Sequence, residues 1–347
     1  MRKAVESFCG AGGLSLGLQQ AGFKVSYAFD NNEMAVNSYN NYFTDKHCYL
    51  KDVTKLSGHE ILKSIGMAEG ELDLFAGGPP CQGFSRQKKG AHNGDKRNNL
   101  VLDFARLVKE IRPKVFLLEN VDMLGLKRGR EFVDGVFNIL QNYDLHPNFY
   151  NSSDYNLAQK RVRFIIVGTR KDLNLKFEIP APITVNGNRR TVGEVIGNLP
   201  EPPDDYSVHP DFFNHQKARV TDINIERFSH VPQGGGWKDI PFELRLKCHQ
   251  TVDTSKGGWP DVYGRLEWDG QCPTITGGFD SFTRGRYGHP KFNRSLTARE
   301  AALLQGFPVD FEFIGNRGEV RKQIGNAVPP PLAKVIGRAV IDMLESN

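Results

Sequence analysis

The first half of the chain alternates short apolar runs with helix-like segments, and this alternation constrains the fold more than any other feature. Apolar runs at residues 4–8, 24–29, 72–76, 115–118 and 164–168 predict strands, and the segments 14–21, 34–42 and 100–111 predict helices. Strands that alternate with helices are typical of a mostly parallel sheet with helices on both faces. The sequence therefore predicts an α/β fold.

The alternation ends near residue 180, where prolines gather and the chain becomes rich in loops. Five prolines fall between residues 180 and 203, and glycine pairs recur up to about residue 290. We expect a second, smaller domain of short strands and loops over residues 185–317. The first domain would comprise residues 1–184 and 318–347, because a final apolar helix at about 332–344 has the spacing of one packed on a sheet.

A glycine-rich segment, Phe8 to Gly13, follows the first predicted strand and opens the first predicted helix. Glycines let a backbone approach a ligand closely. Asp30 ends the second strand, where an acid can bind ribose hydroxyls, and Asp52 is a candidate partner for an adenine amino group. These residues predict a nucleoside-cofactor pocket, and on their own they leave both a nicotinamide dinucleotide and S-adenosylmethionine open.

Two prolines and a cysteine follow the third strand, in Gly78-Pro79-Pro80-Cys81. Ligands and reacting groups gather at the carboxyl ends of strands in open α/β sheets. The next segment, 82–98, carries five basic residues and one acid, and positive surroundings lower the pKa of a thiol. We therefore interpret Cys81 as a thiolate nucleophile and not as a buried structural cysteine.

Polar residues also mark the ends of the next two strands. Glu119 follows the strand 115–118, so its carboxylate would face the same crevice as Cys81. Gln159, Arg161 and Arg163 alternate ahead of the strand 164–168, which places their side chains on one face. An acid and alternating arginines at strand ends indicate a functional site more than a solvated face.

The net charge of +5 is small for 347 residues, and its distribution is more informative. Basic residues concentrate at 82–98, 159–163 and 284–299, which predicts three basic patches and salt-sensitive binding of a polyanion. The five cysteines form no Cys-x-x-Cys pair and the nine histidines lack zinc-binding spacing, so we expect free thiols and no metal. The absence of a signal peptide and of a membrane-length apolar run predicts a cytoplasmic, nucleoid-associated protein.

Six motifs in order make the sequence resemble the DNA cytosine-5 methyltransferase family of bacterial, restriction-modification type. They span nearly the whole chain: Phe8-Cys9-Gly10-Ala11-Gly12-Gly13, Gly78-Pro79-Pro80-Cys81-Gln82, Glu119-Asn120-Val121, Gln159-Lys160-Arg161-Val162-Arg163, Arg299-Glu300 with Gln305-Gly306-Phe307-Pro308, and Gln323-Ile324-Gly325-Asn326-Ala327-Val328-Pro329. The resemblance implies a Rossmann-like, S-adenosylmethionine-dependent catalytic domain and a target-recognition domain.

The resemblance also implies roles for four catalytic residues. The Cys81 thiolate would add to carbon 6 of a flipped cytosine, which activates carbon 5 for methylation. Glu119 would protonate or hydrogen-bond ring nitrogen 3. Arg163 would hold the cytosine carbonyl oxygen, and Arg161 would support Glu119 or the loop that follows Cys81.

For the cofactor and the DNA, the resemblance implies two further sets of residues. S-adenosylmethionine would be held by Phe8, Gly10, Gly12, Asp30, Asp52, Pro80, Leu100 and Asn326. DNA would be contacted by Ser85, Arg86, Gln159, Thr274, Arg284 and Arg286, where each arginine could read guanine or contact phosphate alone. One departure is Asn31, which stands where many family members place an aromatic that stacks on adenine.

The expected partner is double-stranded DNA, with a separately acting restriction endonuclease as a possible companion and a monomer as the expected state. Two alternatives stay open. The family branch that methylates transfer RNA has a Cys-Phe-Thr signature that this chain lacks. A catalytically silent DNA-binding homologue would have no need of Cys81, Glu119, Arg161 and Arg163 together.

Overall fold

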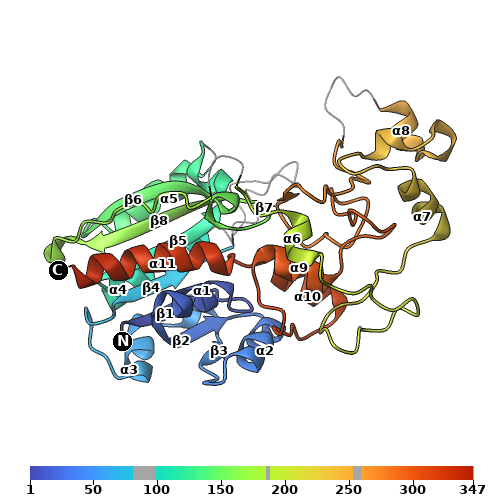
Figure 1. Ribbon diagram of the computed structural model, residues 1–347. Helices are drawn as coiled ribbons and strands as arrows, with labels where there is room; N and C mark the ends of the chain where they lie inside the picture. The colour runs from blue at the N-terminus through green and yellow to red at the C-terminus, as the bar shows by residue number, and fades with distance from the viewer. Residues whose placement is uncertain (81–98, 128, 185–187, 253–258, 347) are drawn as a thin grey trace. The chain divides into compact units, whose positions relative to one another are not determined.

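The computed structural model describes residues 1–80, 99–127, 129–184, 188–252 and 259–346, which form two compact units (Figure 1). The first unit comprises Met1–Tyr155, Val162–Ile183 and Ala327–Asn347, and the second comprises Asn156–Arg161 and Thr184–Asn326. The expected opening of a second domain at residue 185 lies beside the boundary at Thr184. The expected return at residue 318 falls within helix α10 (Arg317–Asn326), which belongs to the second unit.

A seven-stranded sheet forms the centre of the first unit, in the order β3-β2-β1-β4-β5-β8-β6. Its strands are β1 (Lys3–Ser7), β2 (Lys24–Asp30), β3 (Cys48–Leu50), β4 (Leu74–Gly77), β5 (Val115–Val121), β6 (Tyr143–Asn151) and β8 (Val162–Arg170). The strands β1 to β5 pair in parallel, whereas β8 runs antiparallel to both β5 and β6. The predicted α/β class with a mostly parallel sheet is confirmed.

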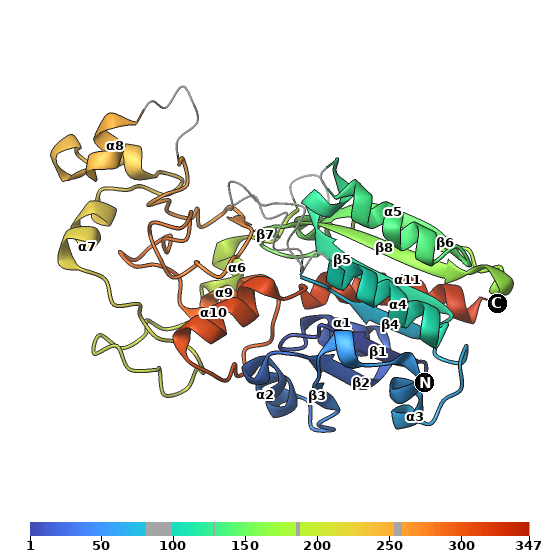
Figure 2. The same cartoon turned by 180° about the vertical axis from the view of Figure 1, so that it is seen from behind.

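Helices cover both faces of this sheet, as the two opposite views show (Figures 1 and 2). Helices α3 (Gly58–Ile65), α4 (Leu100–Ile111) and α5 (Arg130–Ile139) bury their apolar sides in one core with Val5, Phe75 and Phe116 of the strands. On the opposite face α1 (Gly13–Ala21) packs against α11 (Pro330–Glu345), and α2 (Glu33–Tyr42) follows β2. The last helix of the chain thus packs beside the first.

The second unit is built from short helices and loops around a small aromatic core. It contains α6 (Val192–Ile196), α7 (Asp222–Ser229), α8 (Lys247–Thr251), α9 (Ala298–Gln305), α10 and the paired strands β7 (Gln159–Lys160) and β9 (Cys272–Pro273). The rings of Phe228 and Phe282 stack with centroids 4.3 Å apart, and the Arg265 guanidinium lies 4.0 Å from the Phe228 centroid. Among the residues described in the two units, no helix is long and apolar enough to cross a membrane.

Candidate active site

The register of the parallel strands brings the predicted site residues of the first unit to one edge of the sheet. Ser7 of β1 pairs with Phe29 of β2 and with Gly77 of β4, and Gly77 pairs with Leu118 of β5. The residues that follow these partners are Phe8, Asp30, Gly78 and Glu119. Because the strands end at the same level, these four residues lie at the carboxyl edge, where α/β sheets bind ligands.

The glycine-rich loop after β1 has a backbone that few residues other than glycine adopt. Phe8, Gly10 and Gly12 all have positive φ angles, of 54°, 54° and 94°. A side chain on Gly12 would lie 2.6 Å from the ring of Phe43, so this glycine is needed for packing. A Cβ on Gly10 would meet no atom within 4 Å. The loop therefore leaves open space beside Gly10, which a ligand can approach closely.

Asp30 connects this loop to the start of α2. Its Oδ2 accepts the Gly10 N–H at 2.9 Å, and its Oδ1 accepts the Asn32 N–H at 2.9 Å. Burial raises the pKa of Asp30, while these backbone hydrogen bonds act in the opposite direction. A carboxylate has about four acceptor positions, so each oxygen retains capacity for a ribose hydroxyl. An open glycine loop beside a carboxylate of this kind fits a nucleoside cofactor.

The other predicted cofactor residues are distributed over several elements. Asp52 is an exposed cap whose Oδ1 accepts from the backbone and the hydroxyl of Thr54 at 3.0 and 2.8 Å, and these bonds lower its pKa. Pro80 follows β4, and Leu100 begins α4 and packs against the core. Asn326 is the exposed last residue of α10 in the second unit.

Glu119 and Arg163 form a buried ion pair in the first unit. Arg163 Nε lies 2.9 Å from Glu119 Oε1, and the two residues are 8% and 7% exposed. Burial lowers the pKa of Arg163, and the carboxylates of Glu119 and Asp122 oppose that shift. A Cβ on Gly78 would lie 3.0 Å from Glu119 Oε2, which keeps this position small. The structure thus brings together two of the four predicted catalytic residues.

Asn120 belongs to the motif Glu119-Asn120-Val121, and the sequence alone predicted no role for it. Its side chain is buried, its Nδ2 donates to the Pro79 carbonyl at 2.8 Å, and its Oδ1 accepts the Val121 N–H at 2.9 Å. The amide therefore fixes β5 to the diproline turn that precedes Cys81. Its position directly after Glu119, at the end of a buried strand, is the signal that could have found it.

Arg161 lies in the second unit and is 1% exposed. Its Nη1 and Nη2 donate to the carbonyls of Ile275 and Gly325 at 2.9 and 3.0 Å. A Cβ on Gly325 would lie 2.5 Å from the Gly277 nitrogen, so these segments pack backbone to backbone. Glu119 is not among the partners in these two bonds, which instead make Arg161 a support of the Thr274–Ile275 segment.

Gln159 supports the same segment from the other side. Its Oε1 accepts the Ile275 N–H at 2.9 Å, while its Nε2 donates to the carbonyl of Leu304 and to Gln305 Oε1 at 3.2 and 2.6 Å. The side chain is fully buried. These hydrogen bonds give Gln159 a structural role, and they provide no support for its predicted contact with DNA.

The remaining predicted DNA residues in the second unit differ in their surroundings. The Thr274 hydroxyl donates to the Lys160 carbonyl at 3.0 Å. Arg286 Nη1 donates to the carbonyls of Gly234 and Arg265, and its Nε pairs with Asp261 at 3.4 Å. Arg284 is exposed and has no salt bridge within the described ranges. Arg284 is therefore the better placed of the two arginines to contact a ligand.

Three predicted site residues lie outside the described residues, namely Cys81, Ser85 and Arg86, and so does the predicted basic patch at 82–98. The predicted basic patch at 284–299 is only partly present, because two of its arginines are buried. Arg294 pairs with Glu201 and Glu300 at 2.6 and 2.7 Å, and Arg299 donates to the carbonyls of Phe213 and Phe311. The prediction of a basic surface patch was wrong for these two residues, because their guanidinium groups bind carboxylates and backbone carbonyls within the second unit.

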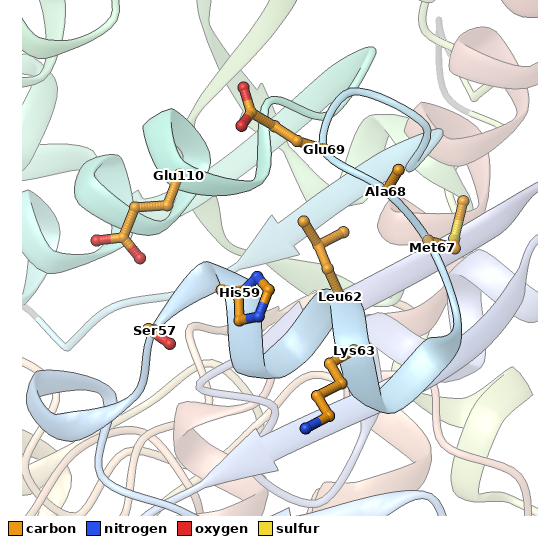
Figure 3. A pocket seen from close by; sticks show the side chains of 8 residues that line it. All are labelled: Ser57, His59, Leu62, Lys63, Met67, Ala68, Glu69 and Glu110. Carbon is orange, nitrogen blue, oxygen red and sulfur yellow. The ribbon is translucent and has the colours of Figure 1, made fainter.

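Figure 3 shows a cavity of about 790 Å³ formed by α3, the turn that follows it and the end of α4. The cavity is lined in part by four polar side chains, His59, Lys63, Glu69 and Glu110. None of the predicted site residues lines it. Within the described part of the chain, no group of three or more His, Cys, Asp and Glu side chains is arranged to hold a metal ion.

Comparison with known proteins gives a consistent result over nearly the whole chain. The model of the family described as C-5 cytosine-specific DNA methylase matches residues 2–342. Type II methylase M.HgiDII of Herpetosiphon aurantiacus is 33% identical over 348 residues, which cover 98% of this chain and 95% of that protein. Type II methyltransferase M.BbvI of Brevibacillus brevis is 36% identical over 97% of this chain and 90% of its own.

A solved structure from Escherichia coli is similar over the same extent. It is a prophage-encoded protein assigned as a DNA modification methyltransferase, and it is 28% identical to this chain. The TM-score is 0.74, with 99% of this chain and 100% of the other covered.

Proposed function

Since the chain belongs to the C-5 cytosine-specific DNA methylase family, we propose that it methylates cytosine at carbon 5 in duplex DNA through a covalent intermediate with Cys81. Membership establishes the enzyme class, a DNA (cytosine-5-)-methyltransferase of type II kind, and implies the use of S-adenosylmethionine. What we propose beyond the enzyme class is the role of each residue described below.

The buried Glu119–Arg163 pair carries the assignment of the chemistry. A target base cannot be reached within the duplex, so the cytosine is flipped into the site. The Cys81 sulfur forms a bond to carbon 6, and the displaced electron pair moves toward carbon 5 and ring nitrogen 3. A proton taken up when the base binds is shared between nitrogen 3 and the Glu119 carboxyl group and neutralises the displaced pair, and the Arg163 guanidinium stabilises charge on the carbonyl oxygen. Both side chains are buried and ion-paired, so they need to move little when charge develops on the base.

The cofactor would lie along the glycine loop. The loop residues Phe8, Gly10 and Gly12 would contact the cofactor through their backbone and the Phe8 ring. Asp30 would bind its ribose, and Asp52 would bind its adenine. The predicted cofactor residues also include Pro80 and Leu100, as neighbouring walls, and Asn326. When bound, S-adenosylmethionine supplies the electrophilic methyl group. After methylation, a solvent base takes the carbon 5 proton, the freed electron pair restores the double bond between carbons 5 and 6, and Cys81 leaves as a thiolate.

We assign target recognition to the second unit, in which Arg284 is exposed. In the same unit Thr274 donates to the Lys160 carbonyl, and Gln159 and Arg161 hold the backbone of Ile275. We further propose that the enzyme acts as a monomer without a metal and protects DNA from a separate restriction endonuclease. The nuclease should then cut the DNA of a strain that lacks the methyltransferase gene. If that DNA stayed uncut, the proposed partnership between the methyltransferase and the nuclease would be contradicted.

The first test is transfer of a labelled methyl group to duplex DNA or to transfer RNA. We expect label in DNA alone; label in RNA alone would select the other branch of the family, and none would favour a silent homologue. DNA with 5-fluorocytosine at the target should trap a covalent adduct, because the fluorine cannot leave as the proton does. Cys81→Ser should abolish the adduct, whereas Cys248→Ser at an exposed cysteine should not.

A further inference from the structure

Two thiols in the first unit touch beside the glycine loop, and the proposed function uses neither. Cys9 Sγ lies 3.3 Å from Cys48 Sγ, and the residues are 5% and 3% exposed. Cys9 lies between Phe8 and Gly10, and Cys48 is the first residue of β3. The pair therefore joins the loop that would hold the cofactor to the edge strand of the sheet.

The backbones of both cysteines are fixed to neighbouring elements. The Cys9 N–H donates to the Phe29 carbonyl at 3.2 Å, and its carbonyl accepts from Gly12 at 2.9 Å. Asn40 holds both sides of Cys48, accepting its N–H at 3.2 Å and donating to its carbonyl at 2.8 Å. A disulfide has a sulfur–sulfur distance of about 2.05 Å, so the two sulfurs need to approach by only about 1.3 Å.

We propose that Cys9 and Cys48 form a reversible disulfide that weakens cofactor binding; the location of the cofactor rests on the proposed function, but the cross-link does not. The oxidant is a small-molecule disulfide. One cysteine thiolate attacks it and releases one thiol, and the second cysteine then attacks the mixed disulfide and releases the other. Two electrons and two hydrogens pass from the cysteine pair to the small disulfide.

Burial decides when this reaction can occur. The Cys9 thiol is enclosed, and desolvation together with the nearby Cys48, Asp30 and Glu6 raises its pKa, so the closed loop offers little thiolate. An oxidant therefore reaches the pair when the glycine loop opens. A bound nucleoside cofactor would contact the loop at Gly10 and keep it closed. The disulfide should consequently form faster in the free enzyme than in the cofactor complex.

The cross-link would act on the loop through the residues beside Cys9. Drawing Cys9 toward β3 displaces Phe8 and Gly10, and Gly10 N–H is held at 2.9 Å by Asp30 Oδ2. A displacement of about 1 Å in a binding site can cost one to two orders of magnitude in function. We expect the affinity for S-adenosylhomocysteine to fall roughly tenfold on oxidation.

The direct test is peptide analysis of the full-length wild-type enzyme after incubation with oxidised glutathione. The protein is alkylated, digested without reduction and examined by mass spectrometry. A peptide linking Cys9 to Cys48 should appear, should form more slowly with S-adenosylhomocysteine present, and should vanish after dithiothreitol. Absence of that peptide, or pairing of Cys9 with another cysteine, would overturn the proposal.

Affinity measurements test the consequence. Oxidised wild type should bind S-adenosylhomocysteine roughly tenfold more weakly than reduced protein, and Cys48→Ser or Cys48→Ala should be insensitive to oxidised glutathione. The matched control Cys248→Ser, at an exposed thiol, should lose affinity like wild type. A cross-link without loss of affinity would refute the coupling. If even reduced protein bound no S-adenosylhomocysteine, the proposed function would fail, while the peptide would still decide the disulfide.

Discussion

Glu119 and Arg163 are both largely buried and lie within ion-pair distance of each other. Glu119→Gln keeps the size of the side chain but removes its ability to hold a proton at ring nitrogen 3. We expect kcat to fall by about 10²- to 10⁴-fold, as for loss of a general acid, with DNA affinity little changed. Single-turnover methylation measures this. A loss confined to KM would instead indicate a role in binding.

Asn120 is expected to act as a positioning residue through Pro79. Asn120→Asp keeps the shape but places a carboxylate oxygen against the Pro79 carbonyl, now 2.8 Å from a donor. We expect kcat to fall by roughly tenfold or more while KM for DNA is unchanged. Asn120→Ala should also cost about 1–3 kcal/mol of unfolding free energy, because a buried carbonyl loses its donor.

The control for this series is Asn142→Ala, at an exposed asparagine distant in sequence from the motifs. It should leave both kcat and the free energy of unfolding unchanged. If Asn120→Asp lowered stability but left kcat intact, the contact with Pro79 would be structural only.

The placement of side chains was predictable from the sequence where strand ends decide it, as for Glu119 and Arg163, which form an ion pair. It was not predictable where a distant segment buries a polar side chain. Gln159 bonds to Gln305 and Arg161 to Gly325, partners about 150 residues away. Arginine and glutamine side chains look like surface residues in a sequence, and only the fold supplies the acceptors that make their burial tolerable.

At the level of elements, α1 and α11 pack closely against each other. A Cβ on Gly17 would lie 2.4 Å from both Ala333 Cβ and the Pro330 carbonyl oxygen. Gly17→Ala should therefore destabilise the enzyme by about 1–3 kcal/mol, the usual cost of overpacking, despite the better helix propensity of alanine. Denaturant unfolding measures the change.

Gly318→Ala in α10 is the matched control, because its nearest neighbour is the end of the Asn316 side chain at 3.2 Å. That substitution should be neutral or stabilise by up to about 1 kcal/mol. Equal effects of the two substitutions would contradict the packing argument.

Strand prediction succeeded for buried apolar runs and missed two edge strands. β3 has only three residues, and β6 carries Asp144, His146 and Pro147 among its nine. Both lie at the edges of the sheet, where one side of the backbone needs no partner and polar residues and proline are tolerated. The alternation of apolar runs therefore identified the interior of the sheet and left its borders undefined.

For the whole molecule, the expected signature of DNA binding is its dependence on salt. Arg284→Ala should weaken binding, and if Arg284 contacts a phosphate the slope of log affinity against log salt should become shallower by about 1. If it reads a base, discrimination at one position should relax by about 1–3 kcal/mol. Arg338→Ala, an exposed arginine on α11, should change neither quantity.

The packing of α11 against α1 also sets an order of events during synthesis. Arg2 Nη2 donates to the Leu344 carbonyl at 2.5 Å, so the two ends of the chain are held together. About 300 residues separate α1 from α11, and at ribosomal rates the interval between them is about 15–60 s. During that time the face of α1 that carries Gly17 has no cover. The nascent chain must therefore keep this face from other partners until its last helix leaves the ribosome.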